Sequence, residues 1–212
     1  MTYPRALKTG LAALTITAAL ALAGCSDQDM GAMAPSSAAP SAGSSGSSPS
    51  VGPSTSAEFN DADVMFVQMM MPHHEQAVAM SDTLLAKTGV NPDVTALAQQ
   101  IKAAQQPEID TMKGFLTAWG QQPMDGGMGG MNHGSDGGMA TEAQLKEFDQ
   151  ADGPGGQKMY LTLMTAHHEG AIKMAETEVS DGKNPEAVDL AKNIIATQQQ
   201  EIGTMKDLLG TL

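Results

Sequence analysis

Apolar residues recur with a helical period through most of the chain beyond about residue 60. In the segment from 66 to 84, apolar residues and one histidine are separated by alternating steps of four and three residues. These residues are Phe66, Met70, His73, Ala77, Met80 and Leu84. This spacing places side chains on one face of a packed helix. A later segment repeats the register with Tyr160, Met164, His167, Ala171 and Met174. The alternation typical of strands is nearly absent, so the pattern predicts an all-α protein.

Capping residues divide this region into four long helices and a short one. We expect helices over about 60–89, 91–120, 142–149, 152–182 and 184–209. Pro92 and Pro185 each follow an asparagine, an order that is typical of an N-cap residue and the first helical position. Thr141 and Gln144 have the spacing of a capping box, which marks the start of the short helix.

The long helices form two copies of one hairpin. The run MMMPHHEQAVAM at 69–80 matches LMTAHHEGAIKM at 163–174, and residues 91–116 align with 184–209. The first match has an offset of 94 and the second of 93, so one residue is lost in a hairpin turn. A helix pair cannot bury its own apolar stripe. We therefore expect both hairpins to pack as an antiparallel four-helix bundle within residues 58–212.

The N-terminal part of the chain has a different composition. Residues 1–24 are predicted to be a lipoprotein signal peptide, because a short basic start is followed by an apolar run that is shorter than the roughly 20 residues of a membrane span. The run ends in Leu-Ala-Gly-Cys, which resembles a bacterial lipoprotein box and predicts lipidation at Cys25; a plain secretion signal is the alternative. Residues 25–57, rich in Ser, Ala, Gly and Pro, are expected to be a disordered linker. These features predict an extracytoplasmic protein anchored to the cell membrane.

The net charge and the single cysteine argue against one class of partner and one kind of covalent bond. A formal net charge of -13 argues against nucleic acid as a partner. Cys25 is the only cysteine, so an intrachain disulfide cannot form. The sequence does not indicate a protein partner.

Four of the five histidines lie in the two His-His-Glu runs. His73 and His167 lie on the apolar face of their helices, which we call the seam. His74 and His168 are rotated by about 100° from it, onto the flank of the helix. Neighbouring side chains on one helix diverge, so a pair of adjacent histidines cannot easily chelate one ion. Met70 and Met164 each lie three and four residues before a histidine pair and can reach either ring. By spacing, Met80 belongs to a neighbouring layer, about 10 Å along the helix from His73.

Glutamates and further methionines complete the set of candidate residues. Glu75 and Glu169 could orient the histidines as hydrogen-bond acceptors. In the second helix of each hairpin, Glu108 shares a face with Met112, as Glu201 does with Met205. Periodicity does not settle whether this face or the side of Ile109 and Ile202 points inward. We expect the isoleucines to point inward and the glutamates to be partly exposed.

The candidate ligands are imidazoles and thioethers, a combination that favours copper and especially Cu(I). Methionine on a seam can also be ordinary core packing, but equivalent histidines that each follow a methionine favour metal binding. A di-iron site needs Glu-x-x-His on two helices, a blue-copper site needs a thiolate, and structural zinc more often has cysteine ligands. None of these patterns is available in the bundle sequence.

The loop at 121–140 is rich in Gly, Met and His. Its candidate ligands are Met124, Met128, Met131, His133 and Met139. Because the intervening glycines cannot form a packed core, this loop could capture Cu(I) weakly; a linker of biased composition is the alternative.

The His-His-Glu-x-Ala-x-x-Met runs, the Gln-x-x-Glu-Ile-x-x-Met-Lys helices and the Met-rich connector together resemble the bacterial, CopM-like domain of unknown function family 305. The resemblance covers about residues 58–210. It implies a ferritin-like four-helix bundle, exported or lipid-anchored, with some members binding copper through His and Met. The positions to which it assigns metal binding are His73, His74, Met70, Met80, His167, His168, Met164 and Met174.

The leading hypothesis is therefore a membrane-anchored protein that sequesters copper, confers tolerance to it or transfers it. A metal-free helical interaction protein, with histidines as satisfied core groups, is the alternative. A small redox metalloenzyme is a third hypothesis, but the sequence contains no nucleophile constellation or cofactor loop that supports it.

Overall fold

The structure is a computed structural model that describes residues 58–123 and 137–212. Within these ranges the secondary structure consists of helices only, which confirms the all-α prediction. The helices are α1 (Asp61–Leu85), α2 (Pro92–Ala118), α3 (Glu142–Gln150), α4 (Gly153–Asp181) and α5 (Pro185–Thr211). Cys25, Met124, Met128, Met131 and His133 lie outside the described residues, as do the predicted signal peptide and linker.

The helix starts agree with the predicted caps. Asn91 and Asn184 accept hydrogen bonds from the first backbone N–H groups of α2 and α5. Thr141 and Gln144 form the reciprocal capping box of α3. The predicted C-terminal ends are less accurate, because α1 ends at Leu85 and a short turn then continues to Gly89, which adopts a φ of 77°.

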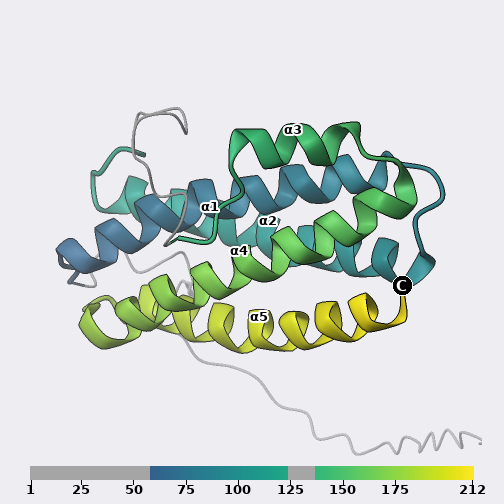
Figure 1. Cartoon of the computed structure of the whole chain (residues 1–212). Coiled ribbons are helices and arrows are strands. Elements are labelled where there is room, and N and C mark those ends of the chain that lie inside the picture. Colours follow the sequence, from purple (N-terminus) through teal and green to yellow (C-terminus); the bar gives the residue numbers. More distant parts are fainter. Residues whose placement is uncertain (1–57, 124–136) are drawn as a thin grey trace, which may run out of the picture. The chain divides into compact units, whose positions relative to one another are not determined.

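The four long helices form a bundle of two hairpins, α1 with α2 and α4 with α5 (Figure 1). The hairpins meet mainly through α1 and α4, while α2 and α5 contact each other less. The α1–α4 pair is antiparallel. Asn60 Nδ2, at the start of α1, donates to Asp181 O at the end of α4, while Lys87 Nζ, just after α1, donates to Ala151 O just before α4. The two helices that carry His-His-Glu are thus adjacent.

The apolar core is divided into two clusters by a polar layer. Phe66, Met70, Ile109 and Ile194 belong to the first cluster. The second cluster includes Met80, Leu84, Ile101, Tyr160 and Met164. Between these stretches on every long helix lie the buried or half-buried polar residues His73, His74, Gln105, Glu108, His167, His168, Gln198 and Glu201. We call these eight residues the polar layer.

Residues 137–140, the end of the Met-rich loop, dock onto the bundle beside this layer. Gln76 holds Ala140 by two hydrogen bonds, donating to its carbonyl at 3.0 Å and accepting from its N–H at 2.8 Å. The backbone of this docked segment lies against α4 at Gly170, where a Cβ atom would be only 2.0 Å from Gly137 O. A residue without a side chain is therefore required at Gly170.

We expect Gly170→Ala to destabilise the protein, although alanine favours the helix, because the added methyl must displace the docked backbone. Overpacking of this kind costs about 1–3 kcal/mol. Gly203→Ala is the matched control, since it is also inside a helix but nothing lies within 4 Å of its Cβ position. That variant should gain up to about 1 kcal/mol from helix propensity. Urea unfolding measures both free energies, and a gain in stability for both variants would contradict this assignment.

Candidate metal site

His73 and His167 meet where α1 and α4 cross. Their ring centroids are 3.7 Å apart with the planes tilted by 40°. Both residues are buried, in agreement with their predicted place on the two seams. The duplication therefore brings one histidine from each copy into direct contact.

Backbone carbonyls determine the tautomers of these two rings. His73 Nε2–H donates to Gly137 O at 2.7 Å, and His167 Nε2–H donates to His73 O at 2.9 Å. A carbonyl oxygen only accepts, so the proton of each neutral ring is on Nε2 and the lone pair is on Nδ1. Neither Nδ1 atom has a hydrogen-bond partner among the described residues.

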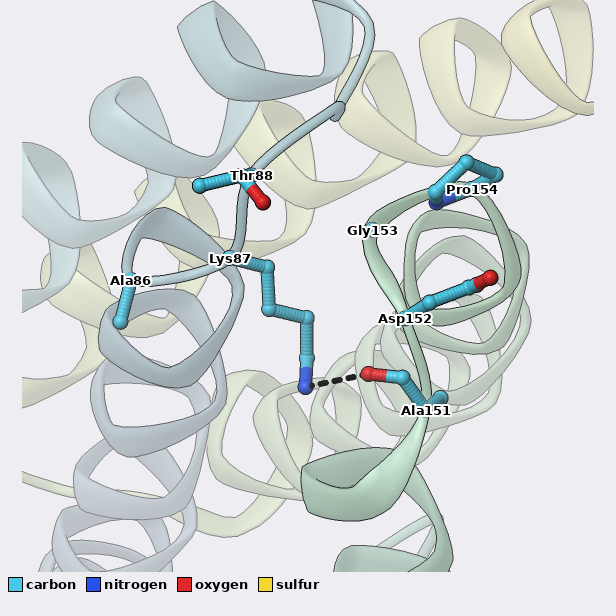
Figure 2. A pocket seen from close by; sticks show the side chains of 7 residues that line it. All are labelled: Ala86, Lys87, Thr88, Ala151, Asp152, Gly153 and Pro154. Atoms are coloured by element: carbon cyan, nitrogen blue, oxygen red, sulfur yellow. Dashed lines mark hydrogen bonds between the residues drawn. The ribbon is translucent and has the colours of Figure 1, made fainter.

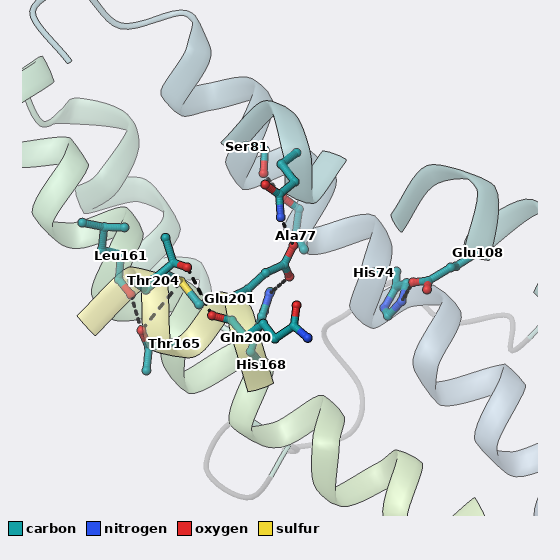
Figure 3. A network of polar contacts seen from close by, with 12 residues as sticks. His74, Ala77, Ser81, Glu108, Leu161, Thr165, His168, Gln200, Glu201 and Thr204 are labelled. Atoms are coloured by element: carbon teal, nitrogen blue, oxygen red, sulfur yellow. Dashed lines mark hydrogen bonds and ion pairs between the residues drawn. The ribbon is translucent and has the colours of Figure 1, made fainter. Parts of the chain in front are cut away.

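His74 and His168 point toward the second helix of their own hairpins. His74 Nε2 lies 2.8 Å from Glu108 Oε2, and His168 Nε2 lies 2.8 Å from Glu201 Oε2 (Figure 3). Both rings are completely buried, because the helices α2 and α5 cover the flanks to which the sequence assigned them. Their Nδ1 atoms are also without a partner in the described ranges.

The prediction that Glu75 and Glu169 orient the histidines is wrong. Both side chains are exposed and face lysines, Glu75 toward Lys113 at 3.9 Å and Glu169 toward Lys206 at 3.3 Å. A residue that directly follows the histidine pair is rotated by a further 100° and leaves the covered flank. The acceptor role therefore belongs to Glu108 and Glu201, which approach from the neighbouring helices.

The orientation expected for the second helices holds in one hairpin only. In α2, Ile109 is buried and the Glu108 side chain is 21% exposed, as predicted. In α5, Glu201 is only 3% exposed while Ile202 is half-buried. Gln198, Glu201 and Met205 are spaced by three and four residues, so they share one buried stripe of α5.

The six predicted bundle methionines divide equally between the two sides of the polar layer. Met70 and Met112 are buried in the first apolar cluster, where the half-buried Met174 packs. Met80, Met164 and Met205 are buried in the second cluster. Met70 and Met80 consequently lie in different layers, as their spacing predicted. Each side of the polar layer thus contains methionine thioethers from both copies of the hairpin.

Sequence reasoning missed one contribution to this region and gave no role to a second. The acceptors for His73 and His167 are backbone carbonyls, for which a side-chain pattern contains no signal. Gln105 and Gln198 are both 2% exposed and occupy equivalent positions, and their amide atoms have no hydrogen-bond partners in the part of the chain that is described. The Gln-x-x-Glu-Ile-x-x-Met-Lys pattern of both second helices includes these glutamines, but it does not indicate that they are buried.

Burial keeps the central histidines neutral. Desolvation lowers the pKa of His73 from 6.5 to about 3, against the opposing effect of its hydrogen bond to Gly137. Desolvation also lowers the pKa of His167 well below 6.5, and the neighbouring histidines His73, His168 and His74 add to this shift. A neutral imidazole is the form that binds a metal, so no proton has to leave these two rings near neutral pH.

The described side chains fit a soft metal better than a hard one. Among residues 58–123 and 137–212, no three His, Asp or Glu side chains converge in a manner that could hold a metal ion. The buried methionines of the two adjoining apolar clusters offer thioether sulfur as a further ligand type. Mixed imidazole and thioether ligands favour Cu(I).

A cavity of about 340 Å³ lies elsewhere, between the end of α1 and the start of α4 (Figure 2). Lys87 crosses it and donates to Ala151 O at 2.9 Å. None of the predicted site residues lines this cavity. The polar layer is therefore the candidate functional site.

Fold and site together define a duplicated four-helix bundle with a buried layer of His, Glu and Gln between methionine-containing clusters. Residues 63–209 match the family described as "Domain of unknown function (DUF305)". The chain belongs to the DUF305 family, which confirms the resemblance seen in the sequence.

Several solved structures are similar to this chain. A DUF305 fragment from Deinococcus radiodurans is 33% identical, with a TM-score of 0.66 over 72% of this chain and 98% of that one. A DUF305 protein from Streptomyces coelicolor, described as a secreted protein, is 33% identical with a TM-score of 0.64, covering 71% and 91%. CopM in its Cu(I)-bound form is 27% identical with a TM-score of 0.58, covering 70% and 96%. No curated protein sequence matches the chain.

Proposed function

We propose that this protein binds copper, chiefly Cu(I), outside the cytoplasm while anchored to the cell membrane. Its role would be sequestration of copper, tolerance to it or its transfer. The ligands would be Nδ1 atoms of the histidines and sulfur atoms of the methionines on either side of the polar layer. The Met-rich loop at 121–140 would collect the ion weakly before it reaches the bundle.

One observation carries this proposal: in all four buried histidines Nε2 has a hydrogen-bond partner, whereas Nδ1 has none among the described residues. A buried polar atom without a partner is unfavourable. Histidines that bind metals typically donate their other N–H to a carbonyl or carboxylate, which sets the tautomer and the ring orientation. The four rings have this arrangement, with two carbonyl and two carboxylate acceptors.

The roles of the individual residues follow from their places in the bundle. His73 and His167 are the central metal ligands, and Met70 and Met164 are the methionines that spacing places beside them. His74 and His168 are further metal ligands, and the hydrogen bonds of their Nε2 atoms to Glu108 and Glu201 hold the rings in place. Met80, Met112, Met174 and Met205 supply thioethers in the adjoining layers.

The comparisons are consistent with this proposal. CopM, to which the chain is 27–29% identical, has been crystallised with Cu(I), Cu(II) and silver. For an extracytoplasmic location, the support is the lipoprotein-like sequence ending at Cys25 and the relative described as secreted. Within the described ranges, no helix is long and apolar enough to cross a membrane.

Metal analysis of the whole protein, prepared without a His tag and offered copper, zinc and iron together, tests the function. We expect copper to be retained in preference to zinc and iron. Cu(I) should also remain bound against a chromophoric Cu(I) chelator. If the chelator removes all copper and no metal is retained, the proposal is wrong and the bundle is a metal-free interaction protein.

A further inference from the structure

Two carboxyl groups are buried together at the end of the bundle where α1 begins and α4 ends. Asp63 lies in the first turn of α1 and is completely buried. Glu178 lies in the last turn of α4 and is 1% exposed. This pair lies ten residues, or about 15 Å along α1 and α4, from His73 and His168, and the proposed copper site does not use it.

Backbone N–H groups surround Asp63. Its carboxylate accepts from Asn60 N at 2.6 Å, from Lys183 N at 3.0 Å and from Asn184 N at 2.9 Å. These bonds connect the start of α1 to the turn between α4 and α5. These N–H donors make Asp63 the hydrogen-bond acceptor of the pair.

Glu178 has the opposite environment. Neither of its oxygens accepts a hydrogen bond from any described residue. Gly182 makes room for this carboxyl group, because a Cβ atom there would be 2.4 Å from Glu178 Oε1. An ionised carboxylate buried without donors is strongly unfavourable, whereas a protonated one can donate to Asp63.

The charged groups around Glu178 also favour its protonated form. Burial raises its pKa from 4.5 to about 8, together with the hydrogen bond to Asp63 and the negative charges of Asp63 and Asp181. The nearest lysine in the turn does not compensate, since Lys183 Nζ pairs with the exposed Glu58 at 2.7 Å.

The other hairpin shows that the fold does not require two acids here. By the repeat offset of 94, Asp63 corresponds to Gln157 and Glu178 to Leu84. Gln157 Oε1 accepts from Asn91 N at 2.7 Å, just as Asp63 accepts from the equivalent Asn184. Leu84 is completely buried. A neutral amide and an aliphatic side chain therefore close the equivalent turn.

We propose that Asp63 and Glu178 form a proton-binding site that makes closure of this end of the bundle dependent on pH. One proton lies between the two carboxyl groups when the end is closed. When the end opens, Glu178 becomes solvated and releases that proton.

The direction of the pH effect follows from linkage. The closed state binds more protons than the open state between pH 4.5 and about pH 8, so closure weakens as pH rises through that window. The equilibrium constant for opening should increase by about tenfold per pH unit within this window and become constant above it.

Amide hydrogen exchange on the whole protein, corrected for the intrinsic effect of pH, tests this dependence. Protection of the Asn184 N–H should fall by about tenfold per pH unit over the window. The Asn91 N–H is an internal control at the equivalent turn and should not follow this fall. Glu178→Gln preserves the shape and a donor to Asp63 but cannot titrate, so protection of Asn184 should become independent of pH.

Infrared spectroscopy provides a second measurement that does not depend on the stability of a variant. At pH 7 the wild-type protein should show the C=O stretching band of a protonated carboxylic acid, and Glu178→Gln should lose it. The proposal is overturned if this band is missing from the wild type. It is also overturned if Asn184 and Asn91 respond to pH alike, or if the Glu178→Gln variant keeps the wild-type dependence.

Discussion

Replacing His73 and His167 together by alanine should abolish the retention of Cu(I). The two rings are the only imidazoles of the described chain that touch across the α1–α4 interface, and each carries an unpartnered Nδ1. We expect the apparent affinity to fall by about 100-fold or more, which corresponds to about 2.7 kcal/mol. Competition with a chromophoric Cu(I) chelator measures the change.

Glu75→Gln/Glu169→Gln is the matched control for that variant. These residues lie next to the histidine pairs in both copies but are exposed and face lysines. The control should keep wild-type copper binding. Circular dichroism must show that the alanine variant remains helical, because its loss of two N–H donors leaves Gly137 O and His73 O without those partners. A folded alanine variant that retains Cu(I) as the wild type does would refute the assigned site.

Glu201→Ala should destabilise the protein more than Glu108→Ala. Both carboxylates accept from a completely buried histidine at 2.8 Å, but the Glu201 side chain is 3% exposed and that of Glu108 is 21% exposed. Removing Glu201 leaves the Nε2–H of the buried His168 without its acceptor, at a cost of about 1–3 kcal/mol. Water can replace the Glu108 carboxylate more readily, so that loss should be smaller.

Urea unfolding of the metal-free protein measures both free energies. Glu201→Gln is the informative companion variant, since its amide oxygen can still accept from His168. It should recover much of the stability lost in Glu201→Ala. Equal losses for the two alanine variants would show that the difference in burial does not decide the strength of these pairs.

Prediction from the sequence succeeded where a periodic pattern determines the structure. The spacing of Phe66, Met70, His73 and Ala77 predicts one buried face, and all four side chains are buried. The Asn-Pro and Thr-x-x-Gln patterns identify the starts of α2, α3 and α5, because capping is a local interaction. Helix ends were predicted less well, since α1 stops before the glycine that marks its turn.

Prediction was weaker where a second helix decides the environment. Glu75 and Glu108 were both candidate residues in the sequence, but only Glu108 approaches a histidine ring. Equivalent positions can also differ, as Glu108 and Glu201 do in burial, because the two hairpins are repeats with different neighbours. Sequence spacing along one helix does not contain this information.

The sequence by itself determined the all-α class, the duplicated hairpin and the seam on which His73 and His167 lie, because helical period and capping act over a few residues. Only the tertiary structure decided which atoms of these histidines are available. The acceptors of Nε2 come from Gly137, from the backbone of α1 and from the facing helices α2 and α5. Those contacts join residues 33 or more positions apart, so packing, rather than local pattern, leaves Nδ1 as the nitrogen of each ring that has no partner among residues 58–123 and 137–212.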